Sequence, residues 1–352
     1  MTSQNPVSSR AFASDNQAGV HPTVMNRMAL AAEGFASAYG NDALTRQVEA
    51  QLSERFETDC SVFLVGTGTA ANALALSALC PPHGAVLCHR EAHIVNDECT
   101  APEFFTGGAR QVSVPGEWGK PDLAGLEYRM EQLTFRGVHS VKPSVLSLSN
   151  ATEMGTIYGP GELARYGSFC RRHGLALHVD GARFANALAS QAMSAAELSW
   201  KQGVDVLTLG ATKGGAMAAE AVIFFNRDLA EDFGFKRKRG GHLWSKHRLL
   251  AAQFEGWLSD GLWLELARQA NQLARNLADG LAEVPGISIS IPVEANMVFP
   301  ILPAAMAAAL RDEGFEFYDW PTQPGMVRLV TSFATEEASV EDLIARARHH
   351  AE

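Results

Sequence analysis

The sequence has few cysteines and no long apolar run. Its 352 residues contain five cysteines, an odd number without the regular spacing of a disulfide framework, which is typical of reduced thiols in a cytoplasmic protein. No uninterrupted apolar stretch reaches the ~18 residues that a membrane span needs, and residues 1–16 lack the apolar core of a signal peptide. We therefore expect a soluble, cytoplasmic protein without a membrane partner.

Positive charge is scarce as well. The chain has 29 lysines and arginines against 39 aspartates and glutamates, a formal net charge of -10. Nucleic acid is not expected as a partner, because binding to a phosphate backbone needs a basic surface. No metal site is expected either, since the two cysteines between residues 88 and 99 lack the CxxC spacing that is typical of metal ligands.

Short apolar segments alternate with segments of helical length, which predicts an α/β fold with a mostly parallel sheet covered on both faces. The expected strands are residues 61–65, 85–88, 144–149, 175–179, 205–209 and 221–225. A long, interrupted helical stretch over 243–281 then leads to short strands and an alanine-rich helix, the pattern of a smaller α+β domain. We predict an N-terminal arm (1–20), a large domain (21–245) and a small C-terminal domain (246–352).

Two charged residues follow apolar strands of this predicted sheet. Asp180 ends the run LALHVD, and Lys213 follows the next strand, flanked by Thr212 and by two glycines. Because one strand-helix-strand unit separates them, both are expected at the edge where parallel sheets bind ligands. A lysine with backbone space around its amine suits bonding to an aldehyde cofactor. Taken alone, a solvated loop lysine is the alternative interpretation.

A glycine-containing turn supplies a third element. The segment VGTGTAAN places Gly68 and Thr69 between a strand and a helix, where free N–H groups and the helix dipole hold a phosphate. Gly66, Gly68 and Ala71 of this segment also satisfy the GxGxxA pattern of an NAD-dependent dehydrogenase, but Cys88 stands at the end of the next strand, where that pattern expects an acid. A single phosphate is therefore favoured over a dinucleotide.

Together these elements predict a site for pyridoxal 5'-phosphate (PLP). Gly68 and Thr69 would hold its phosphate, Asp180 its pyridine nitrogen and Lys213 its aldehyde carbon. A carboxylate about 3 Å from a pyridinium contributes roughly 5 kcal/mol at an effective dielectric of 20, which keeps the ring nitrogen protonated and the cofactor an effective electron sink. A non-catalytic binding protein would have no use for this combination.

The chain also resembles a known family. The segments that carry the resemblance are SDN (14–16), YGND (39–42), TGTAAN (67–72), EAHIVNDE (91–98), HVDGAR (178–183), TKGG (212–215) and RLVT (328–331). They occur in the order seen in L-threonine aldolases, PLP enzymes with the aspartate-aminotransferase fold, and look most like the bacterial low-specificity type. The resemblance implies a lyase that splits β-hydroxy-α-amino acids, such as threonine and phenylserine, into glycine and an aldehyde. It also implies a homodimer with shared sites, commonly paired into a tetramer.

The resemblance assigns further roles to individual residues. His93 would stack on the pyridine ring and relay a proton, with a satisfied core histidine as the alternative. Arg183 and Arg328, with Ser14, would hold the amino-acid carboxylate, and Arg183 would also lie against the cofactor; an ordinary ion pair is the alternative for either arginine. Lys246 would reach the phosphate of the neighbouring subunit.

Two segments depart from the family pattern. Where many members carry a histidine in a segment like ENTHN, this chain reads SNATEMG with Thr152 at that position, and GGAMAAE replaces GLGAPVG after the lysine. A threonine cannot act as a base near pH 7, so either His93 or a water held by Thr152 must take the β-hydroxyl proton. The preferred substrate and this base stay open, and another PLP enzyme, an aminotransferase or a β-eliminating lyase, is the rival interpretation.

Overall fold

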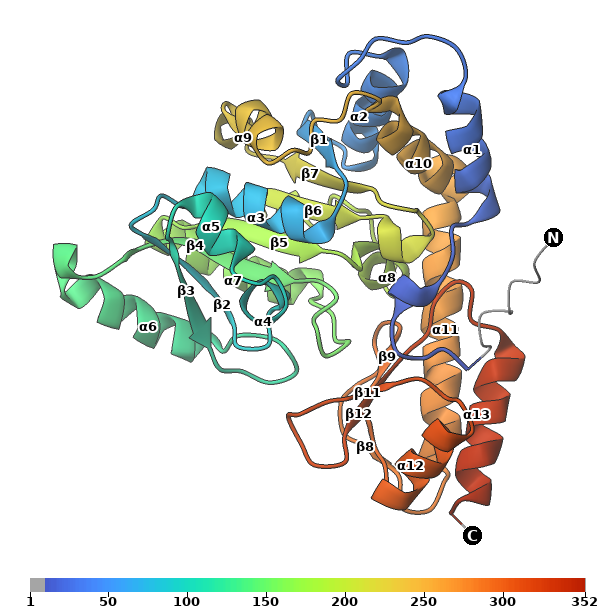
Figure 1. Ribbon diagram of the computed structural model, residues 1–352. Coiled ribbons are helices and arrows are strands. Elements are labelled where there is room, and N and C mark those ends of the chain that lie inside the picture. Colours follow the sequence, from blue (N-terminus) through green and yellow to red (C-terminus); the bar gives the residue numbers. More distant parts are fainter. Residues whose placement is uncertain (1–9, 352) are drawn as a thin grey trace.

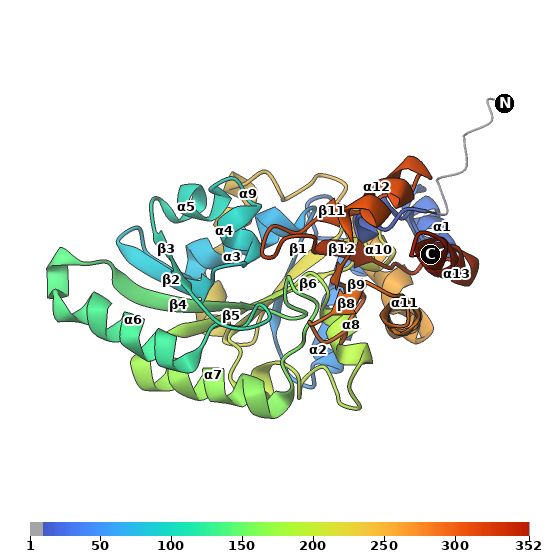
Figure 2. The same ribbon diagram turned by 90° about the horizontal axis from the view of Figure 1, so that it is seen from below.

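The computed structural model describes residues 10–351, and its centre is a seven-stranded sheet (Figures 1 and 2). Its strands are β1 (Ser61–Val65), β2 (Gly84–His89), β3 (Arg110–Val114), β4 (Lys142–Ser149), β5 (Ala176–Gly181), β6 (Val206–Gly210) and β7 (Glu220–Phe224). Their order across the sheet is β1-β7-β6-β5-β4-β2-β3, and β7 runs opposite to the other six strands. The predicted mostly parallel sheet is confirmed.

One strand of the sheet was not expected from the sequence. β3 lies at the sheet edge and pairs only with β2. Its segment RQVSV alternates between exposed or half-buried and buried residues, whereas β2, β6 and β7 are buried throughout. An edge strand of this kind lacks the continuous apolar run by which central parallel strands are recognised.

Helices cover both faces of the sheet and build the small domain. They are α1 (Pro22–Ala32), α2 (Ala43–Arg55), α3 (Gly68–Leu79), α4 (His93–Asn96), α5 (Ala101–Thr106), α6 (Leu123–Phe135), α7 (Pro160–His173), α8 (Phe184–Ala189), α9 (Phe233–Arg239), α10 (Arg248–Leu258), α11 (Leu262–Ala282), α12 (Ala304–Asp312) and α13 (Glu337–His349). Figure 2 shows α3 and α5 on one face of the sheet and α6 and α7 on the other. Within residues 10–351, none of the helices combines the length and apolarity that a membrane span demands.

Local sequence signals set the ends of the helices nearest the sheet. α3 begins after Thr67, whose hydroxyl accepts a hydrogen bond from the Ala70 N–H at 3.2 Å and so satisfies one free donor of the first turn. α7 begins at Pro160, where a proline costs no helical hydrogen bond, and ends at His173. The next residue, Gly174, has a φ of 65°, the left-handed conformation that glycine adopts without strain. The Thr67 cap fixes the residue at which α3 begins, and therefore the place of its N-terminal N–H groups.

The small domain has two short sheets beside α11, α12 and α13 (Figure 1). Its strands are β8 (Ser288–Ile289), β9 (Met297–Val298), β10 (Pro300–Ile301), β11 (Tyr318–Asp319) and β12 (Val327–Val330). Residues 1–9 of the predicted arm lie outside the described residues, and its remaining part joins this domain, because Phe12 is fully buried in its core and its carbonyl accepts a hydrogen bond from the Val330 N–H at 2.8 Å. This contact holds the segment that follows Phe12 next to β12.

The division into domains stays a prediction. The core under the large sheet includes residues of α10 and the first turns of α11, such as Trp257, Trp263 and Ala267. The later turns of α11, from Leu273 to Leu281, belong to the core of the small domain. Packing therefore favours a boundary inside α11, C-terminal to the one predicted at residue 246.

Candidate active site

Two connected hollows lie at the carboxyl ends of β4, β5 and β6. The deeper recess is lined by residues from seven segments: Gly68, Thr69, Asn72, His93, Glu98, Ser149, Ala151, Glu153, Asp180, Ala182, Arg183, Thr208, Lys213 and Glu220. The outer hollow, of about 700 Å³, is lined by Ser14, Asn16, Glu91, His93, Asn96, Asp97, Glu153, Arg183, Lys213, Tyr318, Asp319, Trp320, Pro321 and Arg328. Because several residues line both, the recess opens into the outer hollow.

Asp180 is the acid at the end of β5, and it is 7% exposed. Its carboxylate accepts hydrogen bonds from the Ala182 N–H at 2.9 Å and from the Asn72 amide at 2.7 Å. Burial on its own would raise the pKa of Asp180, but the charges of His93 and Lys213 and these two donors hold the pKa below its ordinary value. The Asp180 carboxylate therefore stays ionised although it is buried, which is the state that a partner of a protonated pyridine nitrogen needs.

Lys213 lies in a 3-10 turn, Thr212–Gly214, directly after β6. The turn is pressed against Trp257: the indole N–H donates to the Gly214 carbonyl at 3.0 Å, and a Cβ at Gly214 would come within 2.9 Å of the ring. Only glycine fits there without displacing Trp257. Burial lowers the pKa of the Lys213 amine and the Arg183 charge lowers it further, which increases the neutral, nucleophilic fraction.

The first turn of α3 brings Gly68 and Thr69 to the same recess. A Cβ on Gly68 would meet no atom within 4 Å, so there is open space beside the backbone at this point. The first N–H groups of a helix have no intrahelical acceptor, and together with the dipole they favour an anion. Lys246, by contrast, is exposed and lines neither hollow of its own chain.

His93 begins α4 and lines both hollows with a side chain that is 39% exposed, so it is not enclosed in a core. Its Nδ1 is 2.9 Å from Glu98 Oε1, and this hydrogen bond raises the pKa of His93 against the opposing effect of burial. The Asn72 amide donates to Glu98 at 2.8 Å as well as to Asp180, and Thr208 donates to the Asn72 carbonyl oxygen at 2.9 Å. Asn72 therefore ties the histidine pair to the aspartate.

The two arginines that were predicted to bind the substrate carboxylate both line the outer hollow, but they have different interaction partners. The Asp15 carboxylate accepts hydrogen bonds from Arg183 Nε at 2.7 Å and from Nη2 at 2.9 Å. Arg183 therefore forms the ion pair that was its alternative role in the sequence. The Arg328 guanidinium lies over the rings of Tyr318 and Trp320, at 5.5 and 5.2 Å from their centroids. Its Nε is buried without a hydrogen-bond partner. A buried, unpartnered guanidinium donor beside a hollow fits an anionic ligand.

Ser14 lies at the rim of the outer hollow, where its hydroxyl accepts a hydrogen bond from the Asn16 N–H at 3.2 Å. Thr152 does not line either hollow, and its catalytic role stays a prediction. Its hydroxyl is fully buried, donates to the Trp118 carbonyl at 3.0 Å and lies 2.9 Å from Thr156 Oγ1. A threonine whose hydroxyl is used in this turn holds no water in the site.

Several polar residues in or beside the recess were not assigned from the sequence. Among them are Asp15, which pairs with Arg183, and the recess residues Asn72, Glu98, Glu153 and Glu220. The first three lie inside the segments that carry the family resemblance, so their position in those segments was an available signal. The last two lie in the segments that depart from the family pattern.

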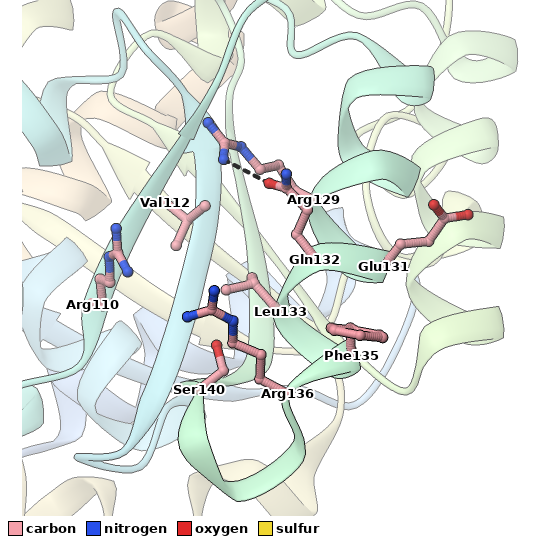
Figure 3. Close-up of a pocket in the computed structure, with 9 residues that line it drawn as sticks. All are labelled: Arg110, Val112, Arg129, Glu131, Gln132, Leu133, Phe135, Arg136 and Ser140. Atoms are coloured by element: carbon pink, nitrogen blue, oxygen red, sulfur yellow. Dashed lines mark hydrogen bonds between the residues drawn. The ribbon is translucent and has the colours of Figure 1, made fainter.

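A further hollow, of about 580 Å³, lies between β3 and α6 (Figure 3). It is lined by Arg110, Val112, Arg129, Glu131, Gln132, Leu133, Phe135, Arg136 and Ser140. None of the predicted site residues is among them. Within residues 10–351, no group of three or more histidine, cysteine, aspartate or glutamate side chains is placed to hold a metal ion.

The residues of the recess fit PLP. Asp180 suits the pyridine nitrogen, Lys213 the aldehyde carbon, and the first turn of α3 the phosphate, and all of them line one recess. Fold and site together define a PLP-dependent α/β enzyme.

Comparison with known proteins specifies the family. Residues 11–304 match the β-eliminating lyase family. The low specificity L-threonine aldolase of Pseudomonas aeruginosa is 46% identical over 332 residues, which cover 94% of this chain and 95% of that protein. The solved threonine aldolase of Leishmania major is 32% identical, with a TM-score of 0.91 and coverage of 97% and 99%. An aspartate aminotransferase from Rhodobacter sphaeroides, 17% identical with a TM-score of 0.71 over 96% of this chain and 89% of its own, shares the fold.

The chain belongs to the β-eliminating lyase family and, within it, to the low-specificity L-threonine aldolases. The predicted fold class, lyase class and dependence on PLP are confirmed.

Proposed function

We propose that the protein cleaves the Cα–Cβ bond of β-hydroxy-α-amino acids, giving glycine and acetaldehyde from L-threonine or L-allo-threonine, and glycine and benzaldehyde from phenylserine. The observation that carries the proposal is the buried Asp180 and the Lys213 amine in one recess that opens onto Arg328. The names of the relatives support the same reaction.

Bound PLP supplies an electron sink for the pair released when the Cα–Cβ bond breaks. Asp180 would keep the ring nitrogen protonated, and the Lys213 amine would bond to the aldehyde carbon. The N–H groups at Gly68 and Thr69 would bind the phosphate, and the imidazole of His93, fixed by Glu98, would pack against the ring. The position and charge of each residue suit the role proposed for it.

The substrate carboxylate would bind in the outer hollow. Arg328 offers its unpartnered Nε, and Arg183 offers the nitrogen that Asp15 does not use. Ser14 lies at the same rim and adds a hydroxyl. Guanidinium groups held by aromatic rings and by a buried acid are pre-organised, so they fix the orientation of the amino acid and thereby select which Cα bond breaks.

We propose a cytoplasmic homodimer with shared sites, paired into a tetramer. Lys246 supports shared sites, because it is exposed and outside the hollows of its own chain, where a basic residue is free to reach a partner's phosphate. Exposed large apolar side chains such as Phe35 and Leu30 on the α1 side offer surface for such contacts. Four of the five cysteines are buried free thiols, in keeping with a reducing compartment.

The proposal is tested by incubating the PLP-loaded protein with L-threonine, L-allo-threonine and phenylserine and measuring aldehyde release against keto-acid formation. Aldehyde and glycine in equal amounts are expected, with loss of both in Lys213→Ala. Keto acid in place of aldehyde would identify an aminotransferase and contradict the proposal.

A further inference from the structure

We propose that Glu153 is the catalytic base that takes the proton of the substrate's β-hydroxyl group. The inference rests on the proposed aldol cleavage and supplies a group that the sequence did not identify. Glu153 is the residue next to Thr152, but the two side chains point in different directions. Thr152 points toward Trp118, whereas Glu153 lines the site.

The two carboxylate oxygens of Glu153 have different surroundings. Oε1 accepts hydrogen bonds from the backbone N–H of His93 at 2.9 Å and from the hydroxyl of Ser149 at 2.5 Å. Oε2 is buried and has no hydrogen-bond partner. One oxygen thus anchors the carboxyl group to α4 and to the end of β4, while the other is left to accept a proton.

Its position relative to both hollows distinguishes Glu153 from the other acids. It lines the recess that fits the cofactor and also the outer hollow where the substrate carboxylate would bind. Glu98 and Glu220 line the recess alone, and Glu91 the outer hollow alone. A base for the β-hydroxyl must reach the junction, because Cβ is attached to Cα, whose amine would bond to the cofactor's aldehyde carbon in the recess and whose carboxylate would bind in the outer hollow.

The other candidate bases are engaged. Thr152 is turned out of the site, and the Nδ1 of His93 is occupied by its hydrogen bond with Glu98. Burial raises the pKa of Glu153 and the charge of Asp180 raises it further, against the donors from Ser149 and His93. Asp180 on β5, the Cys88 thiol on β2 and the Tyr158 phenol lie near enough to interact electrostatically with Glu153, and the His93 backbone N–H donates to it. A carboxylate with a raised pKa is a better base than an ordinary one.

The step balances as follows. The β-hydroxyl O–H bond breaks, its proton bonds to Glu153 Oε2, and its electron pair forms the C=O bond of the aldehyde. PLP would supply the electron sink for the pair of the Cα–Cβ bond. Cα gains one proton from water, and Glu153 releases its proton to water as the aldehyde leaves. No net proton is gained or lost.

The test compares Glu153→Gln with Glu153→Asp and with Glu131→Gln, an exposed control on α6. Glutamine keeps the acceptor for Ser149 and His93 but cannot bind a proton. We expect acetaldehyde release from L-threonine to fall 10²- to 10⁴-fold in Glu153→Gln, which is the usual contribution of general base catalysis, and to recover at least about tenfold in Glu153→Asp. Glu131→Gln should match the wild type.

Two measurements separate a chemical role from a structural one. The PLP dissociation constant, from an absorption titration of the apoprotein, should stay within about threefold in Glu153→Gln. Exchange of the glycine α-proton with deuterated water, which involves no β-hydroxyl, should also persist. Cleavage within tenfold of the wild type, loss of PLP binding, or equal rates for the glutamine and aspartate variants would each overturn the assignment. A wild type that releases no aldehyde would refute the proposed function instead.

Discussion

The buried acid Glu220 makes a quantitative prediction about stability. It begins β7, is 6% exposed, and accepts a hydrogen bond from the Thr212 hydroxyl at 2.5 Å. Its Oε2 lies so close to Gly210 that a Cβ there would come within 2.8 Å of it. Burial raises the pKa of Glu220 from the ordinary value of 4.5 to about 7, and the Thr212 donor and the Lys213 charge offset only part of this effect.

The sign and size of the effect follow from linkage. Because the pKa of Glu220 is higher in the folded state, the native protein keeps a proton that the unfolded chain releases. The stabilisation that Glu220 contributes is therefore fully present below pH 4.5 and is lost as the pH rises toward 7. One pKa unit corresponds to about 1.4 kcal/mol, which gives a loss of roughly 2–3 kcal/mol between pH 5 and pH 8. Glu220→Gln has no proton to lose and removes this contribution.

The measurement is urea unfolding of the apoprotein, followed by tryptophan fluorescence, for the wild type and Glu220→Gln at pH 5 and pH 8. All other titrating groups are common to both proteins, so the difference between them isolates Glu220. We expect the glutamine variant to gain roughly 2–3 kcal/mol relative to the wild type on going from pH 5 to pH 8. A difference that does not change with pH, or that changes in the opposite direction, would refute the reasoning.

Two further substitutions test the site. Asp180→Asn keeps an acceptor for the Ala182 N–H but removes the charge, so kcat should fall at least about 100-fold while the protein still folds; kcat within tenfold of the wild type would contradict the role of the carboxylate. Arg328→Lys loses the planar group that lies over Tyr318 and Trp320, so KM for L-threonine should rise about 10- to 100-fold with a smaller change in kcat, and an unchanged KM would exclude Arg328 from carboxylate binding.

Much of the fold and part of the site could be predicted because the signals are local. Central strands such as β5 and β6 are continuous apolar runs, and a charged residue directly after such a run must lie at the sheet edge, which is how Asp180 and Lys213 were found. The edge strand β3 has no such run and was missed.

The rest of the site depends on contacts between distant segments. The side chain of Asn72 donates hydrogen bonds to both Glu98 and Asp180. Asn72 and Asp180 are 108 residues apart in the sequence, so no local pattern predicts this contact. Thr152 and Glu153 are adjacent, and the turn after β4 decides which of them faces the recess. Family position pointed to the threonine, whereas the tertiary structure points to the glutamate.

The central claim is that Lys213 is the lysine that bonds to PLP, beside Asp180 in the recess after β6. The direct test is to load the protein with PLP, reduce it with borohydride so that the bond between amine and aldehyde carbon becomes permanent, and locate the added mass by peptide mass spectrometry. The account predicts that the modification lies on Lys213 and disappears in Lys213→Ala. Modification of a different lysine, or none in the wild type, would contradict it.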